Sequence, residues 1–87
     1  MYEVQITSEG LRHLDRLPEK VRAAALETIL GSIAENPARL WHALVGELTG
    51  MYSARRGDYR VIYEIDEDAR VVVVLRVQHR RDVYRPR

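Results

Sequence analysis

Cysteine is absent from this 87-residue sequence. The chain therefore forms no disulfide and offers neither a thiol nucleophile nor a cysteine ligand for a metal. This absence fits a reducing compartment, and we expect the protein to act in the cytoplasm. A domain of this length buries only roughly 60–65% of the surface that its unfolded chain exposes, so we expect a single domain of modest stability over residues 1–87.

Long apolar runs are missing as well. The longest is Val71–Leu75, whereas a membrane-spanning helix needs roughly 20 apolar residues. The chain opens Met1-Tyr2-Glu3, without the cationic start and apolar stretch of a secretory signal. We therefore expect a soluble protein that makes no contact with a membrane.

Histidine is scarce, and its three copies are widely separated at positions 13, 42 and 79. Without cysteine and without a His-x-x-x-His spacing, the sequence predicts no metal site. Nothing in it points to another cofactor. We expect His13 and His42 to be structural or solvated.

Lysine is nearly absent, since thirteen of the fourteen basic residues are arginine. Arginine offers phosphate a planar, permanently charged fork. A GC-rich genome would also raise the Arg/Lys ratio, but it would not explain why the arginines cluster. Residues 1–50 carry five basic and seven acidic residues, whereas residues 51–87 carry nine and six. The clustering favours a polyanionic partner at the C-terminal end of the chain.

The first half of the sequence predicts one strand and two helices. Tyr2–Thr7 alternates apolar and polar residues, as a half-buried strand does. Ser8 is expected to cap a short helix, which Pro18 ends. Its apolar edge is formed by leucines at three-residue spacing: Leu11, Leu14 and Leu17.

The second helix is predicted over Glu19–Glu35 and ends before Pro37. Its apolar residues repeat every four positions at Val21, Ala25, Ile29 and Ile33, with Leu26 and Leu30 widening the stripe. Such a stripe faces a core. The two helices should pack as an antiparallel hairpin because the turn between them is very short.

The second half predicts an irregular link over residues 38–50 and then three strands, Met51–Arg56, Asp58–Asp66 and Arg70–Gln78. The third is apolar on both faces and should be central in the sheet. Residues 79–87 form a short polar tail. The expected fold class is α+β: an N-terminal strand, an antiparallel helix hairpin and a three-stranded antiparallel sheet in two layers.

Two motifs resemble the RelE/ParE toxin superfamily of type II toxin–antitoxin systems. The first runs from Gly46 to Tyr63 and contains Leu-x-Gly followed by Arg-x-Gly-Asp-Tyr-Arg-x-x-Tyr. The second is the ending His-Arg-Arg-Asp-Val-Tyr over residues 79–84. The predicted order of elements agrees with the family's along the whole chain.

The resemblance implies a RelE-like toxin that cuts messenger RNA in the ribosomal A site and so inhibits translation. It implies a cognate antitoxin that covers the basic surface, with the ribosome and messenger RNA as further partners. Operator DNA is a candidate partner of the toxin–antitoxin complex. Leu40 and Trp41 are expected to fill the core, with an antitoxin groove as the alternative.

Cleavage of this type uses the substrate's own 2′-hydroxyl, so it requires a base, an acid and a cation that stabilises the charge on phosphorus. By the family pattern, the catalytic residues Arg55 and Arg60 contact the phosphate, and Arg80 acts on the leaving group or the transition-state phosphate. Tyr84 stacks on a base or moves a proton. Auxiliary RNA contacts are expected from Arg56, Arg81 and Arg85. Some members carry a second basic residue where this chain has Ser53, and part of that role could fall to Arg56 or His79.

His79 is the remaining catalytic candidate. An imidazole, with an ordinary pKa of about 6.5, exchanges protons near neutrality far more readily than arginine or tyrosine. The alternative is a histidine that merely supports a turn.

Three functions stay open on the sequence. The first is a ribosome-dependent, metal-independent messenger-RNA endoribonuclease. The second is a ParE-like toxin that poisons DNA gyrase by binding, without ribonuclease activity. The third, which the serine at position 53 keeps open, is a catalytically weak or inactive module that mainly forms a DNA-binding complex with its antitoxin.

Overall fold

The structure is a computed structural model, and it describes residues 1–37, 42–43 and 50–79. Its elements follow one another along the chain as β1 (Glu3–Ile6), α1 (Ser8–Arg16), α2 (Glu19–Thr28), the π-helical turn η1 (Ile29–Ile33), β2 (His42–Ala43), β3 (Tyr52–Arg56), β4 (Tyr59–Asp66) and β5 (Val71–His79). None of the helices in these ranges is long and apolar enough to cross a membrane.

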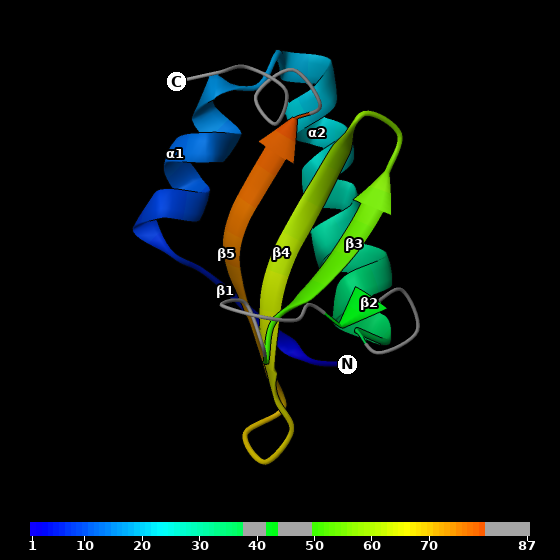
Figure 1. The fold of residues 1–87 in the computed structure, drawn as a ribbon. Helices are drawn as coiled ribbons and strands as arrows, with labels where there is room; N and C mark the ends of the chain where they lie inside the picture. The colour runs from blue at the N-terminus through cyan, green and yellow to red at the C-terminus, as the bar shows by residue number, and fades with distance from the viewer. Residues whose placement is uncertain (38–41, 44–49, 80–87) are drawn as a thin grey trace.

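The strands form one five-stranded sheet in the order β1-β5-β4-β3-β2. β1 runs parallel to β5, while the three other pairings are antiparallel. α2 lies behind the sheet, and α1 lies beside β5 (Figure 1). The predicted α+β class and the central position of β5 are confirmed. The two-residue strand β2 was not predicted, because it lies in the segment expected to be irregular.

The start of α1 lies one residue before the predicted cap. Thr7, not Ser8, is the N-cap, and its hydroxyl accepts a hydrogen bond from the Gly10 amide at 3.1 Å. Leu11 is 50% exposed, so the expectation that it belongs to the buried edge is wrong. A three-residue step falls short of the 3.6-residue turn, so Leu11 lies well around the helix from buried Leu17.

The second helix is helical to Glu35, as predicted, but it contains the π-helical turn η1. A four-residue repeat is longer than an α-helical turn, and the wider π turn keeps Ile33 on the buried face with Ile29. Leu30, predicted to widen the buried stripe, is instead 56% exposed.

Gly31 lies in this turn, and apart from its chain neighbours and the surrounding helix backbone no atom lies within 4 Å of the position that its Cβ would occupy. Glycine in a helix costs about 0.5–1 kcal/mol relative to alanine through the entropy of the unfolded chain. We therefore expect Gly31→Ala to stabilise the fold by about this amount, measured by urea denaturation. A loss of stability would show that the π turn needs glycine.

The core lies between the helices and one face of the sheet. Ala25, Ile29 and Ile33 from the helix pack with Val61, Tyr63, Val72 and Val74 from β4 and β5. Two tyrosine hydroxyls from β4 join the layers. Tyr63 donates to the Pro37 carbonyl at 2.6 Å, and the Tyr59 hydroxyl lies 3.0 Å from that of Thr28. β4 is thus fixed on its helix side, which sets the direction of its other face.

Candidate functional site

The face of the sheet turned away from α2 carries a row of three polar side chains across three strands. Arg55 of β3 lies directly opposite Arg60 of β4, and Arg60 lies opposite Gln78 of β5. Residues paired directly across antiparallel strands project from the same face, with Cβ atoms about 4.5–5.5 Å apart. Because Tyr59 and Val61 face the core, Arg60 faces the opposite side. This face is called the open face below.

Arg55 and Arg60 form a like-charged pair. Like charges directly opposite one another in a sheet are destabilising. Over the ranges that the structure describes, the single ion pair is that between Arg76 and Glu9, so neither arginine has a described carboxylate as counter-ion. Two adjacent guanidinium groups without such a partner are suited to an external anion, and each can bind phosphate in bidentate fashion.

The neighbouring row holds Ser53, Ile62 and Arg76, which are paired in register across β3, β4 and β5. Ser53 is buried. Arg76 is a further cation of the open face, and its Nε lies 3.1 Å from a Glu9 carboxylate oxygen on α1. Arg76 is not among the site residues predicted from the sequence. Alternation along β5, in register with β4, is the signal that identifies it.

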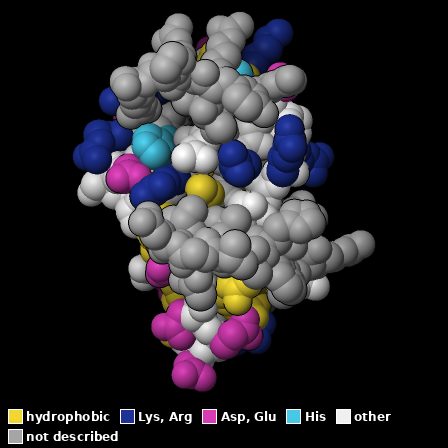
Figure 2. Space-filling view, viewed as in Figure 1, with side chains coloured by type: hydrophobic (Ala, Val, Ile, Leu, Met, Phe, Trp, Pro, Cys, Tyr) yellow, Lys and Arg dark blue, Asp and Glu magenta, His cyan; other side chains and the backbone are white. Residues whose placement is uncertain are grey.

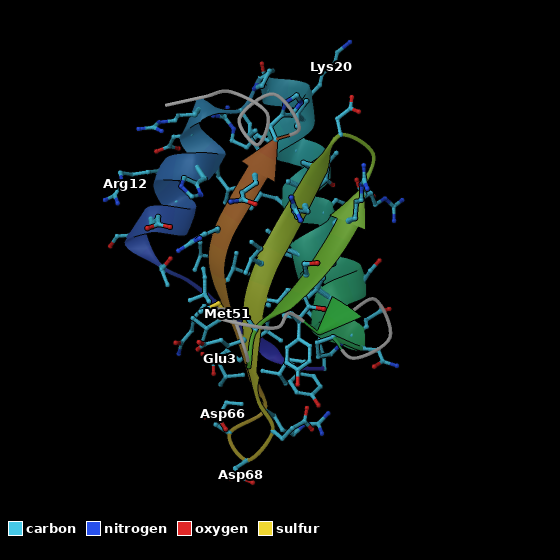
Figure 3. All side chains as sticks on the ribbon, in the orientation of Figure 1. Glu3, Arg12, Lys20, Met51, Asp66 and Asp68 are labelled. Carbon is cyan, nitrogen blue, oxygen red and sulfur yellow. The ribbon has the colours of Figure 1, made fainter. Side chains whose placement is uncertain are left out.

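The charges are segregated along the sheet. Lys and Arg side chains gather around the upper half of the molecule, and acidic side chains gather at the lower tip (Figure 2). Glu3, Asp66 and Asp68 lie near this tip, where β4 turns into β5 (Figure 3). Such a separation orients a polyanion toward the basic half and away from the tip.

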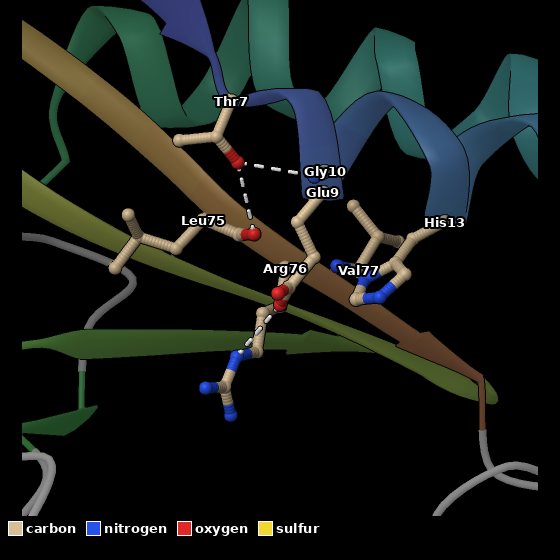
Figure 4. Close-up of polar contacts among 7 residues, drawn as sticks. All are labelled: Thr7, Glu9, Gly10, His13, Leu75, Arg76 and Val77. Atoms are coloured by element: carbon tan, nitrogen blue, oxygen red, sulfur yellow. Dashed lines mark hydrogen bonds and ion pairs between the residues drawn. The ribbon is translucent and has the colours of Figure 1, made fainter.

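α1 is fastened to the exposed edge of β5 beyond the last residue paired with β1, Val74. The Thr7 hydroxyl donates to the Leu75 carbonyl at 3.2 Å, and the Val77 amide donates to His13 Nδ1 at 3.1 Å (Figure 4). Buried Gly10 lets the helix approach, since its Cβ would lie 3.2 Å from the Val74 carbonyl oxygen. Side chains of α1 thus replace a strand at this edge.

His13 makes this contact in its neutral form, because Nδ1 accepts a hydrogen bond. Burial lowers the pKa of His13 below its ordinary 6.5, Glu9 opposes this, and Arg16, Arg76 and Arg12 add to it. A folded-state pKa that is lowered contributes stability above pH ~6.5 and loses it as pH falls toward the folded value.

We therefore expect His13→Asn to flatten the pH dependence of stability between pH 7 and 5. The Oδ1 atom of asparagine can accept the same hydrogen bond but does not titrate. The difference in melting temperature between wild type and variant should shift in favour of the variant as pH falls. A difference that is constant with pH would contradict the role given to His13.

The other predicted residues lie elsewhere. Arg56 and His79 both pair with Tyr59 in register, so both lie on the helix side of the sheet and not with Arg60. Arg80, Arg81, Tyr84 and Arg85 lie outside the described residues, as do Leu40 and Trp41. His42 lies opposite Ser53 in β2. Of the predicted site, the structure therefore brings together Arg55 and Arg60, and it adds Gln78 and Arg76 to them.

Comparison with known proteins gives concordant matches. The family model for the ParE toxin of type II toxin–antitoxin systems matches residues 4–84. Toxin RelG of Mycobacterium tuberculosis is 44% identical over 84 residues, covering 97% of each chain. Toxin RelE of the same organism is 45% identical over 84 residues, which cover 97% of this chain and 87% of that toxin.

A solved structure is similar as well. In the crystal structure of the M. tuberculosis RelBE2 toxin–antitoxin complex, one chain is 43% identical and superposes with a TM-score of 0.88. The match covers 91% of this chain and 98% of the other.

Proposed function

This chain belongs to the RelE/ParE superfamily of type II toxin–antitoxin toxins, and we propose that it is a ribosome-dependent endoribonuclease that cuts messenger RNA and so arrests translation. The observation that supports the proposal is the pair Arg55 and Arg60, which lie opposite one another on the open face. Their repulsion is relieved when a phosphate lies between them.

The proposed reaction is a transfer within the substrate. The 2′-hydroxyl loses its proton, its oxygen forms a bond to the adjacent phosphorus, and the bond from phosphorus to the 5′-oxygen breaks. The leaving oxygen takes up a proton, and the products are a cyclic phosphate and a 5′-hydroxyl. Arg60 and Arg55 stabilise the extra negative charge on the phosphoryl oxygens as the new bond forms.

In this proposal, the groups that transfer protons come from the C-terminal motif of the chain, residues 79–84. The family motif assigns proton transfer to Tyr84, while Arg80 is assigned to the leaving group or the transition-state phosphate. His79 stays a candidate, although its register with Tyr59 puts it on the other side of the sheet from Arg60. The reaction as proposed needs no metal.

A cognate antitoxin is the partner that we propose for the resting state in the cytoplasm, because a relative is held in a toxin–antitoxin complex. A protein that covers the open face would neutralise the same arginines that bind RNA. Binding of operator DNA is proposed for that complex and not for the toxin alone.

The alternative is a toxin that poisons DNA gyrase by binding, and the name of the matching family model favours it. The test is to induce the chain and map messenger-RNA ends on translating ribosomes, with Tyr84→Ala and Arg12→Gln as comparisons. Arg12 is exposed on α1 and points outward from the side of that helix, away from the strands (Figure 3). New RNA ends with wild type and Arg12→Gln, but not with Tyr84→Ala, would support the nuclease. Growth arrest with DNA-damage signalling and no new ends would support the gyrase poison.

A further inference from the structure

We propose that Arg76 is an RNA-phosphate contact and that Glu9 is its counter-ion in the free protein, so that binding of RNA exchanges a carboxylate for a phosphate. The inference rests on the proposed function, because it concerns the same RNA. It adds Arg76 of β5 to the surface that contacts the RNA backbone, and it makes Glu9 of α1 the anion that RNA displaces.

The position of Arg76 supports this assignment. It lies on the open face opposite Ile62, which is two residues from Arg60 on β4. Two residues along a strand span roughly 6.6–6.8 Å, and neighbouring strands are about 4.8 Å apart. Arg76 is therefore one step along and one step across from Arg60. An RNA strand that places one phosphate on Arg55 and Arg60 can reach Arg76 with another.

The pairing with Glu9 supports it further. The two side chains are 42% and 46% exposed, and an ion pair in water contributes little to stability. A contribution to the stability of the fold is therefore a weak explanation for the ion pair between Arg76 and Glu9. Phosphate competes well for such a guanidinium, because the pair is accessible to solvent and phosphate carries oxygens that accept two parallel hydrogen bonds.

The neighbouring contacts place the arginine accurately. Leu75 and Val77, on either side of Arg76, bond through their main chains to Thr7, the N-cap of α1, and to His13 of α1 (Figure 4). The backbone of β5 is therefore fixed at this point, and the Arg76 side chain can change partner while its Cα stays in place. Glu9 lies between Thr7 and His13 in the sequence, so it belongs to the same anchored segment.

Binding to ribosomes tests the proposal without cleavage. The probe is a purified ribosome complex loaded with a 2′-O-methyl messenger RNA, which lacks the attacking hydroxyl. Dissociation constants are measured over a range of potassium concentrations for wild type, Arg76→Gln, Glu9→Gln, the double variant and Arg12→Gln. Arg12 is the matched control, because it is an exposed arginine on α1, the helix that carries Glu9.

We expect Arg76→Gln to weaken binding about tenfold and to lower the slope of log affinity against log salt by about 0.7, the value for one phosphate contact on a single strand. Glu9→Gln should strengthen binding about threefold at low salt, because it removes a competing carboxylate. The double variant should bind like Arg76→Gln alone, and Arg12→Gln like wild type.

Unchanged affinity and slope in Arg76→Gln would overturn the proposal. So would a Glu9→Gln variant that binds as weakly as Arg76→Gln, because the pair would then only anchor α1. Wild-type cleavage of unmodified messenger RNA on the same ribosomes is measured in parallel. If it is absent, the proposed function fails, whereas intact cleavage with an inert Arg76 overturns this inference alone.

Discussion

Arg60→Gln should lower messenger-RNA cleavage by about 10²–10³-fold, the usual effect of removing one group that stabilises a developing anion. Glutamine keeps two donors and much of the length of the side chain but carries no charge. The effect should fall on the rate of the bound complex more than on ribosome affinity, because the charge on the phosphoryl oxygens is greatest in the transition state. Single-turnover cleavage on programmed ribosomes measures it.

The same variant should keep or gain stability. Arg60 lies directly opposite Arg55, and relief of a like-charge contact between strands is worth up to about 1 kcal/mol at low salt. A site that lowers stability in the free protein while it serves binding is a common compromise. Urea denaturation at low and high salt checks this, and the gain should vanish as salt screens the repulsion.

Arg12→Gln is the control, since it removes an exposed arginine from α1 and leaves the open face unchanged. It should cleave like wild type. If Arg60→Gln loses activity together with stability, Arg60 supports the fold, and the catalytic role that we assign to it is wrong. If it loses neither, the phosphate lies elsewhere.

Much of the fold could be predicted from apolar periodicity. The apolar residues of β4 and β5 can be buried only if these strands lie in the interior of the sheet. Pro18 and Pro37 mark the beginning and the end of the second helix. Periodicity failed where the backbone departs from regular geometry. The π turn at Ile29–Ile33 and the irregular register between Ile62 and Tyr63 change which residues face the core, and neither has a distinctive residue pattern.

The site was predictable only in part, because motifs name residues without giving their register. Arg55 and Arg60 share a face, as alternation on two strands suggests. The face of the sheet on which His79 and Arg76 lie could be assigned only once the pairing of β5 with β4 was known. The edge contact of His13 with Val77 spans 64 positions, and no local pattern reports it. A contact between distant segments depends on packing and not on spacing.

Tyr63→Phe should destabilise the fold by about 1–3 kcal/mol, the cost of leaving a buried polar group without its partner. The Tyr63 hydroxyl donates to the Pro37 carbonyl at 2.6 Å, and both residues are fully buried. The change removes one oxygen and creates almost no cavity, so the loss can be assigned to the hydrogen bond. Chemical denaturation at pH 7 measures it.

Tyr59→Phe is the matched control on the same strand. The Thr28 hydroxyl donates to the Ala24 carbonyl, so its contact with Tyr59 is one in which the tyrosine donates. When that hydroxyl is removed, Thr28 still donates its proton, and the cost should stay below about 1 kcal/mol. Equal losses of unfolding free energy in the two variants would show that the Pro37 carbonyl finds another donor. The stabilisation that we assign to the Tyr63 hydrogen bond would then be wrong.

Alkaline titration separates the hydrogen bond from packing. Burial raises the pKa of Tyr63 to about 12, against 10 in the unfolded chain. A raised folded-state pKa gives stability that is complete below pH 10 and is lost as pH rises toward 12. The deficit of Tyr63→Phe relative to wild type should therefore shrink over this interval, while cleavage at pH 7 by the folded variant should stay near wild type. A deficit that does not change with pH would mean that the phenol is not held in its protonated form by the fold.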